Sequence, residues 1–329
     1  MRNTLSSIDA KNSEISKKLD IRPLRKDEVE EAEKLVRLAF GTFFNVPDPT
    51  ANPLERRMIA HRFKQNPRKV IAAAYNQELV GTNVLTEWGS YGFFGPLTVR
   101  PDLWNSGIGG RLVAEAVDQF TQDGKSAQGL FTFADSPKHL GLYHKFGYCS
   151  QFLTTILEKK IETSSSQNYE KFSDLGKGEK IGVMGKIRDL TDQLYSGLDL
   201  SQEIQLVDDN KMGDTLFVFD ESKNLAAFAI CQSGAGTEAG AGRCYVKFGA
   251  SRVGSEASKI FERLLAASES FAFEKNAQVL EAGMNLSHDR AFDVMLASNF
   301  RISFIGVLMQ KPNEPLYSRK DTFVIDDLR

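Results

Sequence analysis

A glycine-rich turn follows a short apolar strand and opens a helix, and its glycines are Gly107, Gly109 and Gly110. The strand is predicted over residues 97–99, and Pro101 ends it because proline supplies no hydrogen-bond donor to a sheet. The first N–H groups of a helix are unpaired and carry a partial positive charge, so they attract anions, and glycines let a ligand reach them. Residues 95–110 therefore predict a pyrophosphate-binding turn, with an unliganded glycine-rich turn as the alternative.

The same residues exclude two other phosphate-binding motifs. A Rossmann fingerprint requires G-x-G-x-x-G and an acidic residue at the end of the next strand. Here the next predicted strand, residues 130–134, leads only to Asp135, which opens a loop. A P-loop requires Lys followed by Ser or Thr after the glycines, and the sequence has no such pair there.

The turn resembles motif A of the GCN5-related N-acetyltransferases (GNATs), whose usual form is V-x-P-x-x-[R/Q]-x-x-G-x-[G/A]. The pattern is matched by Val99, Pro101, Gly107 and Gly109. Trp104 stands where the family usually has Arg or Gln. The resemblance implies that acetyl-CoA binds as a co-substrate, with its pyrophosphate on the helix N-terminus and its pantetheine arm along the preceding strand. The contacts that it implies come from Leu97, Thr98, Val99, Trp104, Asn105, Ser106, Gly107, Ile108, Gly109, Gly110, Arg111, Ser136 and Tyr143.

A second stretch, residues 134–152, resembles motif B of the same family, N-x-x-A-x-x-L-Y-x-K-x-G-[F/Y]. The matching residues are Leu142, Tyr143, Lys145, Gly147 and Tyr148. Ser136 stands at the usual Asn and His139 at the usual Ala, so the family's pattern is altered on that side. Two motifs at the expected separation are more specific than either motif alone.

The resemblance implies transfer of an acetyl group from acetyl-CoA to an amine by direct attack in a ternary complex. Tyr143 matches the position that gives a proton to the departing thiolate, and a phenol with a pKa of about 10 is neutral at working pH. The usual base is a carboxylate near the third or fourth strand. Glu87, beside Trp88 and Tyr91, is the candidate because partial burial would raise its pKa. The alternative for Tyr143 is a packed tyrosine that only hydrogen-bonds the cofactor sulfur. The alternative for Glu87 is an ordinary surface glutamate at the end of a strand.

The elements that must position these residues follow the order β-α-α-β-β-β-α-β-α-β over residues 19–160. Apolar periodicity predicts strands at residues 19–24, 69–74, 79–87, 93–99, 130–133 and 152–158, and helices at residues 29–40, 54–63, 107–123 and 137–145. This order matches the GNAT fold, an α/β (α+β) architecture with a mixed, mostly antiparallel sheet flanked by helices. In that family the central strand diverges from the next strand to open the pantetheine slot. Gly95-Pro96 is the candidate bulge or bend.

One predicted loop, residues 41–53, is unusually apolar because it holds Phe43, Phe44 and Val46. These side chains form either a wall of the substrate pocket or a buried anchor between two helices. In the next predicted helix, His61 is interpreted as a packing or surface residue rather than a base.

The second half of the chain resembles a worn repeat of the first. Residues 161–180 are polar with little periodicity and predict a linker. Residues 299–300 align with residues 147–148 at an offset of 152, which places Met295 at the Tyr143 position. The glycine turn itself corresponds to Ser255, Glu256 and Ala257. A glutamate there would repel a pyrophosphate, and methionine cannot donate a proton. Residues 181–312 are therefore predicted to keep the GNAT fold without its chemistry, and an unrelated α+β domain is the alternative.

The last segment, residues 313–329, alternates apolar and polar residues around Phe323, Val324 and Ile325. This pattern predicts an added edge strand, which could cross onto the other domain.

Composition narrows the classes of function. The chain has 329 residues, enough for two domains, and its net charge of −2 gives no reason to expect nucleic acid or an anionic membrane as a partner. Its cysteines, scattered without a C-x-x-C pair, indicate a reducing compartment and no metal site. No apolar run is long enough to span a membrane, and residues 1–18 lack a secretory signal. We therefore expect a flexible tail at residues 1–18 and a cytoplasmic protein.

The sequence thus predicts an N-acetyltransferase in which residues 19–160 form the catalytic domain. A protein that binds CoA or acyl-CoA as a regulator or sensor, without turnover, is the second hypothesis. O-acyl or thiol acyl transfer in the same slot is the third. The acceptor is expected to be an amine of a small molecule, peptide or protein, and a homodimer remains open.

Overall fold

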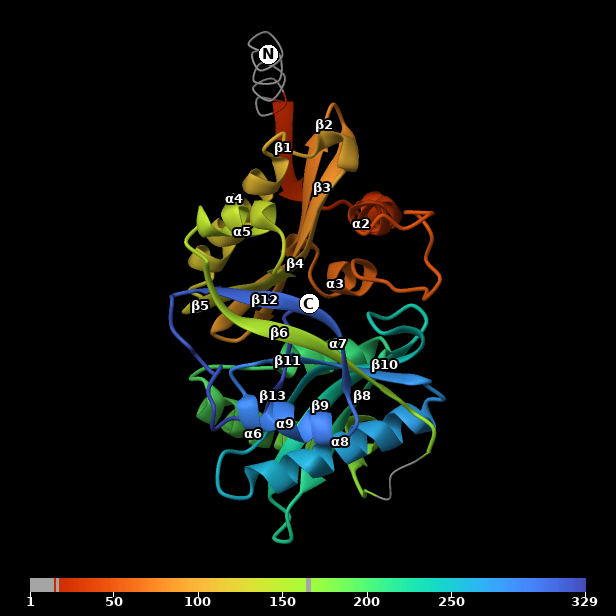
Figure 1. The fold of residues 1–329 in the computed structure, drawn as a ribbon, viewed down its shortest axis with the longest axis vertical. Helices are drawn as coiled ribbons and strands as arrows, with labels where there is room; N and C mark the ends of the chain where they lie inside the picture. The colour runs from red at the N-terminus through yellow and green to blue at the C-terminus, as the bar shows by residue number, and fades with distance from the viewer. Residues whose placement is uncertain (1–14, 16–17, 164–166) are drawn as a thin grey trace.

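The computed structural model describes residue 15, residues 18–163 and residues 167–329 (Figure 1). The tail expected at residues 1–18 lies outside these residues except for Ile15 and Lys18. Ile15 is buried against the first half of the chain, so this position belongs to the core.

The first half contains the predicted elements in the predicted order. They are β1 (Leu19–Pro23), α2 (Val29–Phe43), α3 (Ala60–Gln65), β2 (Val70–Tyr75), β3 (Glu78–Trp88), β4 (Tyr91–Val99), α4 (Ile108–Gln122), β5 (Ala127–Phe133), α5 (Pro137–His144) and β6 (Cys149–Lys160). The helix predicted at residues 54–63 begins only at Ala60. There the carboxylate of Glu33 accepts the N–H groups of Ile59 and Ala60, which fixes the helix start by a tertiary contact.

Helix α4 shows why these segments fold as they do. Its buried side chains recur at helical spacing, and they are Ile108, Leu112, Val113, Ala116 and Phe120. This apolar stripe packs on the sheet, where Gly81 of β3 lies against Leu112 and Ile108. The N-terminus of α4 is thereby held at the end of β4.

The second half repeats the first. Its elements are β7 (Glu170–Lys171), α6 (Lys177–Leu194), α7 (Ser201–Asp209), β8 (Gly213–Phe219), β9 (Leu225–Gly234), β10 (Gly240–Ser251), α8 (Ala257–Glu274), β11 (Val279–Asn285), α9 (Asp289–Ala297), β12 (Arg301–Lys311) and β13 (Val324–Ile325). Strand β11, helix α9 and strand β12 each begin 152 residues after β5, α5 and β6. The stretch expected as a linker, residues 161–180, also holds β7 and the first turn of α6.

All the described strands join one sheet, and β6 and β12 each cross to the other half. The order is β1-β2-β3-β4-β5-β12-β6-β11-β10-β9-β8-β7. Strand β12 pairs antiparallel with β5, and β6 pairs antiparallel with β11. Figure 1 shows β6 and β12 running side by side across the middle of the molecule. The two halves are therefore joined by backbone hydrogen bonds as well as by side chains.

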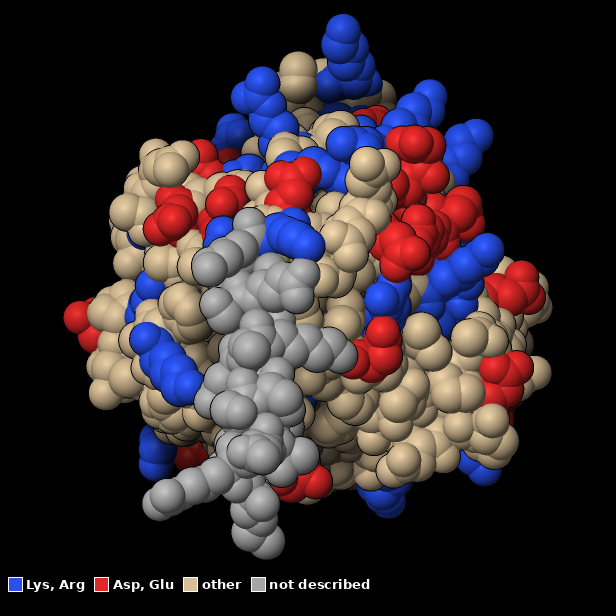
Figure 2. All heavy atoms as spheres, turned by 90° about the horizontal axis from the view of Figure 1, so that it is seen from above, with Lys and Arg blue, Asp and Glu red and all other residues tan. Residues whose placement is uncertain are grey.

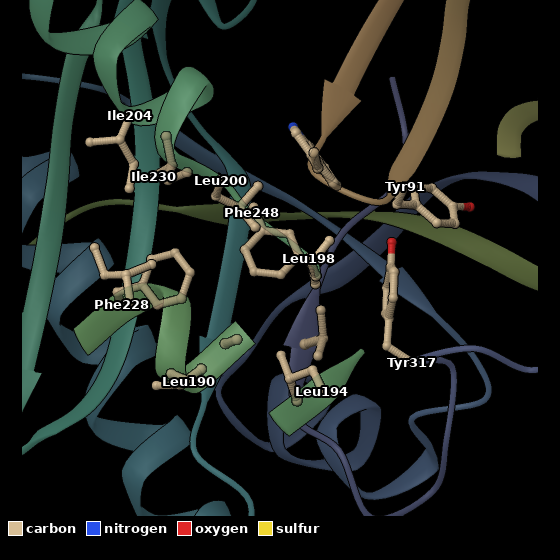
Figure 3. Packing of buried hydrophobic residues seen from close by; sticks show 14 of the residues in the cluster. Tyr91, Leu190, Leu194, Leu198, Leu200, Ile204, Phe228, Ile230, Phe248 and Tyr317 are labelled. Atoms are coloured by element: carbon tan, nitrogen blue, oxygen red, sulfur yellow. The ribbon is translucent and has the colours of Figure 1, made fainter. Parts of the chain in front are cut away.

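A hydrophobic core is also shared between the halves. Trp88 and Tyr91, at the β3–β4 turn, pack with α6, α7 and β10. In Figure 3, Tyr317 points toward Tyr91, and their ring centroids are 5.6 Å apart in an edge-to-face contact. A buried ion pair reinforces this junction, because Arg62 of α3 donates to Glu203 of α7 at 2.7 Å.

The face of the molecule seen in Figure 2 has mixed charge. On this face, basic and acidic side chains adjoin one another over the described residues. No helix in the described part of the chain has the length and apolar character needed to cross a membrane.

The segment after β12 returns to the sheet instead of adding a strand at its edge. Strand β13 pairs antiparallel with β10, where Ala250 faces Val324 and Gly249 faces Ile325. The N–H of Asp326 donates to the carbonyl of Gly283 in β11 at 3.1 Å. The segment thus lies between β10 and β11, beyond the point where those two strands stop pairing. The expected added strand is present, but in the interior of the sheet.

We predict that Gly283→Ala loosens this segment. A Cβ at position 283 would overlap the side chain of Asp327, so either the segment or β11 must shift. Overpacking of this kind lowers the free energy of unfolding by about 1–3 kcal/mol. Urea denaturation measures the change.

Gly182→Ala is the matched control, because a Cβ on this exposed residue of α6 meets no atom within 4 Å. This substitution should leave the free energy of unfolding unchanged or raise it by about 1 kcal/mol. Equal stability of the two variants would show that the segment does not pack against Gly283.

Candidate active site

A slot opens in the sheet where β4 and β5 separate. These parallel strands pair only at Tyr91–Ala127, Gly92–Gln128 and Phe93–Gly129. Beyond Phe93, β4 continues to Val99 and β5 to Phe133 without further pairing between them. The edge of β4 that faces β5 is therefore free to bind an extended ligand by backbone hydrogen bonds.

A bulge in β4 causes this separation. On β3 the residues Asn83 and Leu85 are two apart, whereas their partners on β4, Leu97 and Phe94, are three apart. The extra residue lies at Gly95-Pro96, where Gly95 has φ +153°. A bulge bends its strand, and proline cannot donate to a neighbour, so β4 turns away from β5 here. The predicted bend is in the predicted place.

The N-terminus of α4 closes one end of the slot. Gly107 caps the helix with φ +86°, a conformation that favours glycine, and a Cβ there would meet no atom within 4 Å. Gly109 faces Leu97 and Val99 of β4 and Leu142 of α5. The first N–H groups of the helix have no intrahelical partners, so this turn can bind an anionic group.

A single cavity of about 1180 Å³ connects this turn to the interface between the two halves. Most of the residues predicted to bind the co-substrate line it, namely Leu97, Thr98, Val99, Trp104, Asn105, Ser106, Gly107, Ile108, Gly109, Gly110 and Tyr143. The other two predicted residues do not line the cavity. Arg111 is exposed on α4, and the hydroxyl of Ser136 is hydrogen-bonded to His139. The free strand edge and the helix N-terminus together fit an elongated ligand that carries a pyrophosphate. Acyl-CoA is a ligand of this kind.

Trp104 stabilises the end of β4 beside the slot. Its indole N–H donates to the carbonyl oxygen of Val99 at 2.8 Å, so the end of β4 is held by a side chain. The ammonium of Lys138, on the first turn of α5, lies 5.1 Å from the centroid of the Trp104 ring. Both residues line the cavity beside the glycine turn, where a cation would face a bound phosphate.

Tyr143 lies on the wall of the cavity and is 5% exposed. Burial raises the pKa of Tyr143 above its ordinary value of 10, although a hydrogen bond with Thr132 acts in the opposite direction. The phenol therefore stays protonated at neutral pH and can give a proton. This protonation state is the one that the predicted role requires.

Glu87 is not brought to this cavity. Its partner in the β3–β4 ladder is Gly92, at the end of the strands where β4 and β5 are still paired. Its carboxylate lies 3.1 Å from the ammonium of Lys69 and 3.2 Å from that of Lys125, beside a separate pocket of about 20 Å³. The structure therefore separates Glu87 from Tyr143.

His139 is the titratable residue that the sequence reasoning passed over. It lines the cavity four residues before Tyr143, so both side chains lie on one face of α5. Its Nδ1 is 2.7 Å from the hydroxyl oxygen of Ser136. Burial, and then the charge of Lys138, lowers the pKa of His139 below its ordinary value of 6.5, so the imidazole is neutral at neutral pH. In the sequence, the i, i+4 spacing between His139 and Tyr143 was the one sign that the two side chains share a helix face.

The corresponding slot in the second half is filled. Strands β10 and β11 are also parallel, and they pair from Arg243 to Val246 before separating. Strand β13 occupies the gap that follows. At the start of α8 the capping residue is Glu256, whose carboxylate replaces the open glycine turn with a negative charge. Met295 is buried at the position that corresponds to Tyr143.

Comparison with known proteins agrees with this geometry. A sequence model described as the acetyltransferase (GNAT) family matches residues 32–148. Among curated proteins, no sequence matches the chain. Many solved structures share the fold, at low sequence identity.

Three of these structures span nearly the whole chain. A Pyrococcus horikoshii protein classed as an acetyltransferase has a TM-score of 0.66 at 13% identity, over 94% of both chains. A tandem GNAT protein from the clavulanic acid biosynthesis pathway has a TM-score of 0.56 at 12% identity, over 89% of this chain and 98% of that chain. Saccharomyces cerevisiae N-myristoyltransferase, with bound myristoyl-CoA, has a TM-score of 0.61 at 10% identity, over 95% of this chain and 84% of that chain.

Fold and family model together define an acyltransferase scaffold of the GNAT type. Residues 32–148 match the GNAT family model, and 89% of the chain aligns with the fold of a tandem GNAT protein. Members of this family use acyl-CoA.

We predict that Gly109→Glu abolishes binding of CoA. A glutamate on the first turn of α4 would place a carboxylate against Leu97 and Leu142, where the pyrophosphate is expected, and like charges repel. Calorimetric titration with CoA should show affinity at least 100-fold weaker than that of the wild type.

Gly182→Glu adds the same charge on an exposed face of α6 and should leave the affinity unchanged. Retained binding in Gly109→Glu would place the ligand elsewhere.

Proposed function

We propose that the protein is an acyl-CoA-dependent N-acyltransferase that moves an acetyl group from acetyl-CoA to an amine. The observation that carries this proposal is the single cavity that joins the glycine turn, the free edge of β4 and Tyr143. A protein that only bound CoA would need the turn and the strand edge. It would not need a buried, protonated phenol on the same cavity wall.

The proposal assigns different roles to the two halves. Residues 19–160 carry the chemistry, and residues 181–312, with the segment at 313–329, form a degenerate repeat. The occupied slot between β10 and β11 and the glutamate at position 256 support this division.

When bound, acetyl-CoA supplies the thioester whose C–S bond breaks as the new C–N bond forms. Two residues of this chain transfer protons during the reaction, one as a base and one as an acid. His139, neutral and on the cavity wall, accepts the proton that the attacking amine loses. Tyr143 donates a proton to the departing sulfur and recovers one from solvent. Both side chains belong to α5, so one helix fixes their relative position.

We predict that Tyr143→Phe lowers kcat by about 100-fold or more, because general acid catalysis contributes on that scale. The ring still fills its place beside Phe94, so the affinity for acetyl-CoA should stay within about threefold of the wild type. Thiol release in the presence of an amine, and calorimetric titration, measure the two quantities. Wild-type protein that binds acetyl-CoA but releases no thiol with any amine would favour the sensor hypothesis instead.

The pH dependence should report on His139. A base acts only when unprotonated, so kcat/KM should fall as pH decreases through the pKa of His139. Because that pKa lies below 6.5, the wild type should retain its activity at neutral pH and lose it on the acid side. His139→Gln should remove this acid limb and lower kcat/KM at neutral pH by about 100-fold.

His144, one residue after Tyr143 on the same helix and exposed, is the matched control. His144→Gln should keep the wild-type profile. An acid limb that persists in His139→Gln would assign the base to another group.

A further inference from the structure

Aromatic side chains line the part of the cavity beyond the slot. Phe43, at the end of α2, stacks on Phe133 of β5 with ring centroids 4.4 Å apart. Phe44 lies 5.5 Å from Phe133 and 6.3 Å from Phe304 of β12. We call Phe43, Phe44, Phe133 and Phe304 the aromatic wall.

The aromatic wall lines the cavity and leaves apolar surface exposed at Phe44. Phe44 is 49% exposed, although burial of a phenyl group is worth about 1.5–3 kcal/mol. Phe43 and Phe133 also contact His139, each with ring centroids 5.3 Å apart. The exposed apolar surface therefore begins at the group that we assign as the base.

The second half contributes to this chamber. Phe304 comes from β12, and the floor comes from β10, β11 and the C-terminal segment. On the floor, Glu281 pairs with Arg243 at 2.7 Å, with Arg329 at 2.8 Å and with Arg56 at 3.1 Å. Although burial opposes ionisation, these guanidinium groups hold the pKa of Glu281 at about 2.

Two hydrogen-bond donors on this floor are unused. The Nε atoms of Arg243 and Arg329 are buried and have no hydrogen-bond partner within the described part of the chain. Both arginines line the cavity, and guanidinium groups are good hydrogen-bond donors to carbonyl and carboxylate oxygens. The floor therefore suits a carbonyl or carboxylate oxygen.

We propose that the acceptor is a primary amine that carries an apolar group for the aromatic wall and a carbonyl or carboxylate oxygen for Arg243 and Arg329. This inference rests on the proposed function and names the class of its acceptor. Both an amino-acid derivative and a peptide N-terminus have this chemistry. The repeat in the second half then serves as part of the acceptor site.

The test compares acceptors by thiol release from acetyl-CoA with the full-length protein. L-phenylalaninamide has all three features, glycinamide lacks the apolar group, and phenethylamine lacks the oxygen. We expect kcat/KM for L-phenylalaninamide to exceed that for either of the other two by about tenfold or more. Spermidine, a polycation without an apolar group, should be a poor acceptor. The peptide Phe-Ala-Ala, compared with L-phenylalaninamide, distinguishes the two sources of this chemistry.

A pair of variants locates the effect. Phe44→Ser removes an exposed part of the aromatic wall and should lower the preference for L-phenylalaninamide over glycinamide by about threefold or more. Phe273→Ser changes a phenylalanine of similar exposure, 45%, on α8 and should leave this preference unchanged.

The outcomes separate this inference from the function that it deepens. Glycinamide or spermidine as the better acceptor would overturn the inference and leave the acyltransferase standing. An unchanged preference in Phe44→Ser would also overturn it. If protein that binds acetyl-CoA releases no thiol with any amine, both the acceptor inference and the proposed acyltransferase function are overturned.

Discussion

The pairing of β12 with β5 is the contact on which the candidate site depends. Strand β5 is bonded to β4 only as far as Phe93 and Gly129, and beyond that point the slot separates them. Its position along the slot is therefore fixed from the other side, where β12 pairs with it from Gly306 to Lys311. Gly306 makes this close approach feasible, because a Cβ there would overlap the ring of Phe131. One wall of the slot in the first half is thus held by β12, a strand of the second half.

The gap between two separating parallel strands is open in the first half and filled in the second half. Each half has a parallel strand pair that separates after a few residues, as expected of repeated folds. In the first half the gap adjoins a glycine turn and stays open as a cavity. In the second half the gap holds β13, and Asp326 and Asp327 continue the chain toward the floor of the cavity. Tyr245 donates to Asp327 at 2.8 Å, which ties the segment to β10. In the second half, the chain's own C-terminal segment therefore occupies the slot.

Local patterns predicted much of this structure. Motif A, motif B and the apolar periodicity predicted the element order of the first half, the bend at Gly95-Pro96 and the offset of the repeat. These features depend on neighbouring residues, so the sequence records them directly. The exchange of β6 and β12 depends on pairing between residues about 120 to 180 apart, and strands of similar composition give no signal for the choice of partner.

The candidate site was predictable where a motif fixed it and not elsewhere. Tyr143 and the glycine turn lie together on the cavity, as their motifs predicted. The place of Glu87 at a strand end makes it a candidate base, but the bulge opens the sheet at the other end of that ladder. His139 departs from the family pattern, so the motif identifies it only as an altered position and predicts no role for it. Its function follows from the three-dimensional neighbourhood of Phe43, Phe133 and Ser136.

The central claim is that this tandem fold keeps one open slot because its own C-terminal segment fills the other. Native mass spectrometry of the full-length protein with saturating CoA tests it most directly. The account predicts one CoA bound per chain. Two CoA molecules per chain would contradict it, because the second could bind only if β13 left the gap between β10 and β11.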